Sequence, residues 1–260
     1  MPHPAGSSHR SHLMRLREGI EERAAGKMQQ HGAVQLEGAP PLIGRNFQGN
    51  VYNGRVPNDN DIAISNDGKL VSVINSTMYA YDVEEDSLLS SVSLQAFSQP
   101  LGWVESKYDP KVVYDPGADR FVVVFLSGFT DTTSNIIMGF SETNDPSQGW
   151  HIYSLPGNPI NNDTWSDYPV IGISTHDLFI GINTFTNGST NNSGFTESTF
   201  WQVSLEDGYT GATLTTKYYS GLKVAGKSLF NITPIKGGSA MYGPHMYLLS
   251  NRNLDAENDS

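Results

Sequence analysis

The chain contains no cysteine among its 260 residues, so disulfides, zinc–thiolate sites and cysteine nucleophiles are excluded. It also has no run of 18 apolar residues, which argues against a membrane-spanning helix. Basic residues are scarce: 16 Lys and Arg stand against 27 Asp and Glu, giving a formal net charge of -11. Because phosphate binding needs clustered Lys and Arg, this balance argues against a nucleic-acid partner.

The N-terminus lacks the apolar stretch of a signal peptide, since residues 1–6 read Met-Pro-His-Pro-Ala-Gly. Either the protein is cytoplasmic or its true start lies upstream. Apolar residues make up 37% of the chain, while Gly, Asn, Ser and Thr are abundant. That composition favours many short strands joined by turns.

The chain repeats one pattern three times: an Asp, a short β run, a tight turn and a second β run. The copies begin at Asp61, Asp109 and Asp167, which are 48 and 58 positions apart. Repeats of roughly 40 to 50 residues with several strands each are typical of a β-propeller. The sequence therefore predicts an all-β fold, a β-propeller of four-stranded blades.

Three regions are expected. Residues 1–31 form a disordered N-terminus and a short amphipathic helix, because apolar residues recur at helical spacing from Leu13 to Ala24. Residues 32–57, rich in Gly, Pro and Asn, form an extended lead-in. Residues 58–260 form about three and a half blades. Since propellers close with four to eight blades, we expect the chain to be a fragment of a longer protein.

The strongest candidate site is the set Asp61, Asp109 and Asp167. If the innermost strands of the blades converge on a central channel, these carboxylates line its mouth. They are then candidates to hold Ca²⁺, to bind sugar hydroxyls or to act as an acid/base pair. The alternative is that each Asp accepts hydrogen bonds from the following backbone and fixes the start of its strand.

Aromatic residues cluster beside the third of these carboxylates, in Trp165-Ser166-Asp167-Tyr168. Trp165 and Tyr168 are candidates to stack on sugar rings as part of a ligand-binding site. The alternative is that they fill the gap between adjacent blades.

Residues 141–150 resemble a loosened Asp-box, the Ser-x-Asp-x-Gly-x-x-Trp hairpin of sialidases and related propellers. Ser141, Asp145, Gly149 and Trp150 match, with extra residues between them. In those families the box is a folding element, so the resemblance supports the fold more than an activity. Sialidases also bind a substrate carboxylate with three Arg, whereas this chain has two Arg from Pro57 onward, which counts against that activity.

From about Gly44 to its end, the chain resembles the propeller region of large secreted bacterial proteins that carry a type IX secretion sorting domain. The resemblance is carried by residues 44–49, 57–61, 109–115, 141–146 and 165–169. It implies an extracellular or cell-surface location and leaves the biochemical role open.

The leading hypothesis is a secreted β-propeller that binds glycan or extracellular protein partners without catalysis, with Ca²⁺ as a candidate cofactor. Asp61, Asp109 and Asp167 would contact the metal or ligand, with Trp165 and Tyr168 as stacking surfaces. The rival is a glycoside hydrolase or lyase that uses two of the carboxylates. A third hypothesis is a structural adhesin repeat with no discrete site.

Overall fold

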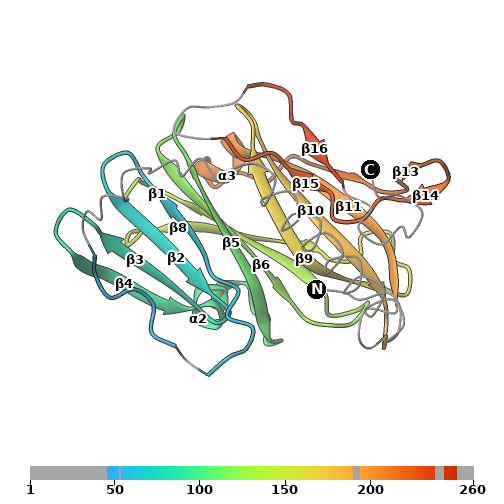
Figure 1. Ribbon diagram of the computed structural model, residues 1–260, viewed down its shortest axis with the longest axis horizontal. Coiled ribbons are helices and arrows are strands. Elements are labelled where there is room, and N and C mark those ends of the chain that lie inside the picture. Colours follow the sequence, from blue (N-terminus) through green and yellow to red (C-terminus); the bar gives the residue numbers. More distant parts are fainter. Residues whose placement is uncertain (1–45, 53, 190–193, 238–242, 251–260) are drawn as a thin grey trace, which may run out of the picture.

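The computed structural model describes residues 46–52, 54–189, 194–237 and 243–250 (Figure 1). The tail and helix predicted within residues 1–31 lie outside this part of the chain, as does much of the lead-in predicted for residues 32–57. The described residues consist mainly of antiparallel strands, with two short α-helices and one 3-10 helix. The all-β prediction is confirmed. In this described part, no helix has the length and apolar character needed to cross a bilayer.

The first sheet is a four-stranded antiparallel meander. Its strands, in spatial order, are β1 (Asp61–Ile64), β2 (Lys69–Ile74), β3 (Thr77–Asp82) and β4 (Ser87–Ser93). The turn predicted between its first two strands is present, and Gly68 takes the left-handed backbone (φ 84°) that the tight turn requires.

The second sheet has the same topology. It contains β5 (Lys107–Asp115), β6 (Arg120–Ser127), β7 (Asn135–Ser141) and β8 (Trp150–Pro156). Every residue of β7 is buried, and so is every residue of β6 except Arg120. Strands that read as continuous apolar runs are covered on both faces, so this sheet lies between two others.

The third sheet repeats the meander with longer strands. They are β9 (Thr164–Ile173), β10 (Asp177–Thr186), β11 (Phe195–Ser204) and β12 (Thr216–Tyr219). In Figure 1 the three sheets follow one another across the molecule in chain order, from blue-green to orange.

Short helices connect the strands. Helix α2 (Leu94–Phe97) and the 3-10 helix η1 (Gln99–Leu101) join the first sheet to the second. Helix α3 (Leu205–Thr210) lies between β11 and β12, where the Ser204 hydroxyl accepts a hydrogen bond from the Asp207 N–H.

The last described residues form two small hairpins. One pairs β13 (Lys223–Val224) with β14 (Lys227–Ser228), and the other pairs β15 (Thr233–Pro234) with β16 (Leu248–Leu249). Ile232, 2% exposed, packs with Phe179 and Phe200 on the outer face of the third sheet.

The sheets pack face to face through two apolar cores. One core joins the first and second sheets and includes Val73, Met78, Phe121 and Phe125. The other joins the second and third sheets and also takes in Leu205 of α3. The face of the first sheet away from the second leaves Ile62 and Ile64 exposed at 62% and 52%.

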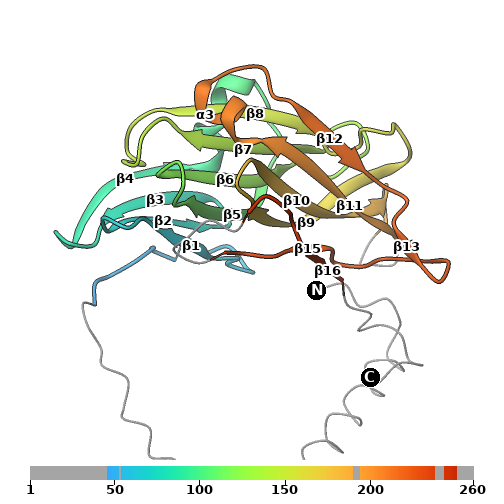
Figure 2. The same ribbon diagram turned by 90° about the horizontal axis from the view of Figure 1, so that it is seen from above.

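The first strands of the sheets are neighbours. β5 contacts both β1 and β9, and β9 contacts β15. Figure 2 shows the sheets from above, with their first strands toward one side of the molecule and their fourth strands toward the other. Residues at the starts of β1, β5 and β9 are thereby brought together, although they are about 50 residues apart in sequence.

Candidate functional site

The starts of the first strands share an unusual backbone conformation. Asp59, Asp109, Tyr168 and Asn231 have φ angles of 45°, 51°, 54° and 51°. Non-glycine residues seldom adopt this left-handed region, and Asn and Asp tolerate it best. One left-handed residue therefore lies shortly before or in the N-terminal half of the first strand of each successive unit.

A β-bulge produces this conformation in the second and third sheets. In β5, Asp109 and Pro110 together lie opposite one residue of β6, because Tyr108 pairs with Leu126 and Lys111 pairs with Val124. In β9, Tyr168 and Pro169 together lie opposite one residue of β10, because Asp167 pairs with Asn183 and Val170 pairs with Gly181. Proline suits the bulge because it has no N–H to donate to the ladder.

The bulges correct the predicted alignment of the three carboxylates. Asp59, Asp109 and Tyr168 occupy equivalent places, whereas Asp167 lies one residue before that place and Asp61 two residues after it. The sequence prediction aligns the repeats on their Asp residues. In the structure, the equivalent residues of the second and third repeats are Pro110 and Pro169.

The structure nevertheless brings three carboxylates together, with Asp59 in the place expected for Asp61. The Asp109 carboxyl is in hydrogen-bonding contact with the carboxyls of Asp59 and Asp167. The sequence analysis missed Asp59. Its signal was the run Asn58-Asp59-Asn60, whose residue types favour left-handed turns.

Proximity of like charges and burial change how these groups ionise. Burial, followed by the charges of Asp167 and Asp59, raises the pKa of Asp109 from 3.8 to about 7, while Lys111 opposes the shift. Burial also raises the pKa of Asp167, although hydrogen bonds from the Tyr168 N–H and from Asp109 oppose this. At neutral pH Asp109 is therefore protonated in part of the molecules, and in these its carboxyl can donate to a neighbouring carboxylate.

Asp61 lies outside this cluster and has different partners. Its Oδ2 accepts a hydrogen bond from the Val112 N–H at 3.2 Å and lies 3.5 Å from the Lys236 ammonium. Its contact with Val112 links β1 to β5.

The two predicted aromatic contacts have different surroundings. Trp165 is half-buried between the second and third sheets, with its ring 6.0 Å from that of Phe129 and 5.8 Å from that of Phe185. Tyr168 is 36% exposed and follows Asp167 directly. Tyr168 is thus a partly exposed aromatic residue next to Asp167 in the chain.

No group of three or more His, Cys, Asp or Glu in the described residues is arranged to hold a metal ion. The predicted trio Asp61, Asp109 and Asp167 does not converge as a set, because Asp61 is engaged with Val112 and Lys236.

The segment matched to the Asp-box forms a connected turn. The Asp145 carboxylate accepts hydrogen bonds from the Ser147 N–H and hydroxyl at 2.9 and 2.6 Å. The Trp150 indole donates to the Pro146 carbonyl at 3.0 Å, and its ring packs edge-on against Phe97. These contacts hold the β7–β8 connection and help to join the first two sheets.

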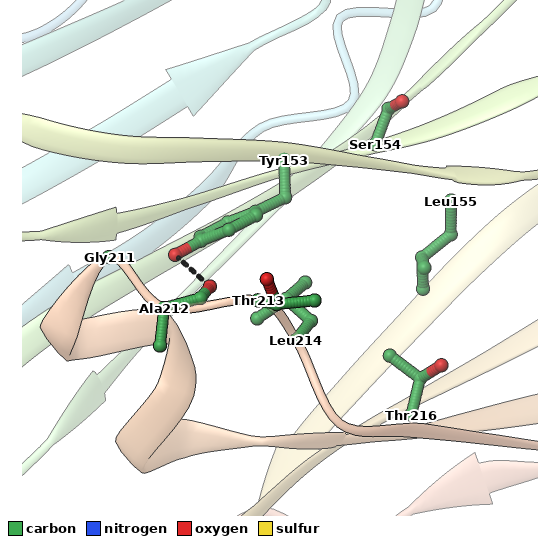
Figure 3. Close-up of a pocket in the computed structure, with 8 residues that line it drawn as sticks. All are labelled: Tyr153, Ser154, Leu155, Gly211, Ala212, Thr213, Leu214 and Thr216. Atoms are coloured by element: carbon green, nitrogen blue, oxygen red, sulfur yellow. Dashed lines mark hydrogen bonds between the residues drawn. The ribbon is translucent and has the colours of Figure 1, made fainter.

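A shallow groove of about 480 Å³ lies at the opposite edge of the sheets, between β8 and the residues that follow α3 (Figure 3). The Tyr153 hydroxyl donates to the carbonyls of Asp207 and Ala212 at 3.3 and 3.1 Å. The lining of the groove includes no carboxylate, imidazole or amine, and its phenol, that of Tyr153, is bonded to two backbone carbonyls.

No family model matches this chain, and no curated protein matches it. The proposed function is therefore drawn from the geometry of the site.

Proposed function

We propose that the protein is a β-propeller binding module whose three sheets are successive blades, and that it binds a glycan where β1, β5 and β9 begin. The blade arrangement is supported by three identical meanders packed face to face with their first strands adjacent. As the sequence resemblance implies, we place this module outside the cell or on its surface.

The observation that carries the proposal is the carboxyl cluster of Asp59, Asp109 and Asp167, with the exposed Tyr168 directly after Asp167 in the chain. Carboxyl oxygens accept hydrogen bonds from sugar hydroxyls, and a phenol ring stacks on the apolar face of a sugar. A cluster that retains a proton near neutral pH has donors as well as acceptors, which suits a neutral, hydroxyl-rich ligand.

Binding is favoured over hydrolysis by the separation of the carboxyls. A glycoside hydrolase that works with two carboxylates needs them roughly 5 to 10 Å apart, so that a sugar bond or a water fits between them. The Asp109 and Asp167 carboxyls lie close enough to shift the pKa of Asp109 and of Asp167, so this pair lacks that separation.

The test is binding to an array of neutral and acidic oligosaccharides, followed by calorimetric titration with the best-bound sugar. Asp167→Ala and Tyr168→Ala should each weaken binding at least about tenfold, which corresponds to the loss of one or two hydrogen bonds or a stacking contact. Leu88→Ala, which removes a 56% exposed apolar side chain on β4, the strand of the first sheet farthest from β1, is the control and should bind normally.

Four other results would each replace the proposal. If no oligosaccharide binds, the glycan assignment is wrong. If the sugar is cleaved, as shown by mass spectrometry of the products, the hydrolase alternative holds. If a chelator abolishes binding, the ligand contacts run through Ca²⁺. If Asp167→Ala unfolds the protein, the carboxyl cluster fixes the strand starts and is no ligand site.

A further inference from the structure

The side chain of Asn75 joins the first and second sheets. Its amide nitrogen Nδ2 donates to Asp59 Oδ2 at 2.7 Å, and its Oδ1 accepts from the Asp109 N–H at 2.7 Å. Its backbone N–H donates to the Asn58 carbonyl at 2.8 Å. Asn75 therefore connects the left-handed residues of two successive sheets.

A neutral version of this junction exists at the far side of the third sheet. Asn183 Oδ1 accepts from the Asn231 N–H at 3.2 Å, and Asn183 Nδ2 donates to Asn231 Oδ1 at 2.5 Å. Asn231 has the same φ as Asp109, 51°. An asparagine thus occupies in one junction the place that Asp109 occupies in the other, so the amide is compatible with this backbone.

The charges around Asp109 are mostly of its own sign. Among the described residues, Asp59 approaches from the segment before β1 and Asp167 from β9, while Lys111 and Tyr108 belong to its own strand. The Tyr108 hydroxyl donates to the carbonyls of Gly128 and Ser166 instead. Lys236 is paired with Asp61.

We propose that Asp109 holds a proton that joins the first three sheets through Asp59 and Asp167, and that release of this proton loosens the junction at Asn75. The protonated carboxyl donates a hydrogen bond to a neighbouring carboxylate. Once the proton is lost, three carboxylates face one another with Lys111 as the nearby compensating charge, and they repel. This device operates whether or not the cluster binds a glycan.

The direction of the pH effect follows from the pKa of Asp109, which is raised from 3.8 to about 7 in the folded protein. The folded state therefore binds this proton more tightly than the unfolded state does. The stabilisation is fully present below about pH 4 and is lost as the pH rises through about 7. Stability should fall between pH 5 and pH 8.

The experiment compares thermal unfolding of the wild type, Asp109→Asn and Asp61→Asn from pH 5 to pH 8 at constant ionic strength. The wild-type Tm should fall on the order of 5 °C over this range. Asp109→Asn should lose most of this slope and melt above the wild type at pH 8. Asp61→Asn keeps the cluster intact and should retain the wild-type slope.

Equal slopes for the wild type and Asp109→Asn would overturn the proposal. If Asp109→Asn does not fold, Asp59→Asn provides a second test. This variant removes one charge that repels ionised Asp109, so the midpoint of the pH effect should move below 7. If the midpoint in Asp59→Asn is the same as in the wild type, the proposal is also overturned. Hydrogen exchange locates the effect, because the protection factors of the Asn75 and Asp109 amides, corrected for the pH dependence of intrinsic exchange, should fall between pH 5 and pH 8 while that of the Asn231 amide is unchanged.

Discussion

Replacing Gly181 with alanine should detach residues 230–235 from the third sheet and destabilise the protein by about 3 kcal/mol. A Cβ at this position would lie 2.1 Å from the Ile232 carbonyl oxygen and 2.9 Å from Val170 Cγ2. The backbone of Gly181 is not left-handed, so the cost comes from the close approach of another backbone. Ile232 would then lose its contact with Phe179 and Phe200.

Urea unfolding measures the loss of stability, and hydrogen exchange of the Asn231 amide reports detachment, since that amide donates to Asn183 Oδ1 of β10 at 3.2 Å. Gly49→Ala is the matched control, because a Cβ at Gly49 would have nothing within 4 Å and no change is expected. If Gly181→Ala is as stable as Gly49→Ala, residues 230–235 do not pack on the third sheet as described.

Replacing Phe140 with alanine should have the largest effect of any core substitution between the second and third sheets. Phe140 is fully buried, and its ring packs edge-to-face with Tyr153 and Tyr209 at centroid distances of 5.8 and 5.6 Å. Deleting a buried phenylalanine side chain costs about 3–5 kcal/mol, from lost burial and the cavity left behind. The loss should loosen α3, which carries Tyr209.

The measurement is again urea unfolding, with near-ultraviolet circular dichroism to follow the two tyrosines. Phe129→Ala is the comparison, because Phe129 is 49% exposed and stacks on Tyr108 at 4.5 Å. That variant should lose about 1 kcal/mol. Equal losses for the two variants would contradict the assignment of Phe140 to the centre of the core.

Much of the fold could be predicted from the sequence because the strands and turns have strong local signals. The alternating run before Asn66-Asp67-Gly68 and the apolar run after it predict β1 and β2. The continuous apolar run from Phe121 to Phe125 lies in the fully covered strand β6. Helix α3 was missed, although Ser204 as a cap, acidic residues in the first turn and Gly211 after the last turn are its signals.

The site was predicted less well because its register depends on bulges. A bulge adds one residue without changing the apolar pattern on either side, so the alternation of the strands does not reveal it. Aligning the repeats on Asp places Asp61 where Asp59 lies and treats Asp167 as equivalent to Asp109. Aligning the repeats on Pro110 and Pro169 makes Tyr168 equivalent to Asp109 and places Asp167 one residue earlier, as observed.

Contacts between sheets could not be read from the sequence at all. Asn75, just after β2, and Asn183, within β10, look like ordinary polar residues, yet each binds the left-handed residue of the next unit. That pairing depends on how sheets about 50 residues apart pack, which local propensity does not encode.

The central claim is that the carboxyls of Asp59, Asp109 and Asp167 meet where the three first strands begin. The most direct test is carbon-13 NMR of the aspartate carboxyls between pH 3 and pH 9. We expect one carboxyl of the Asp109–Asp167 pair to titrate near pH 7 and its midpoint to fall in Asp59→Asn. Titration of both carboxyls near 3.8, unchanged in Asp59→Asn, would show that the three side chains do not meet.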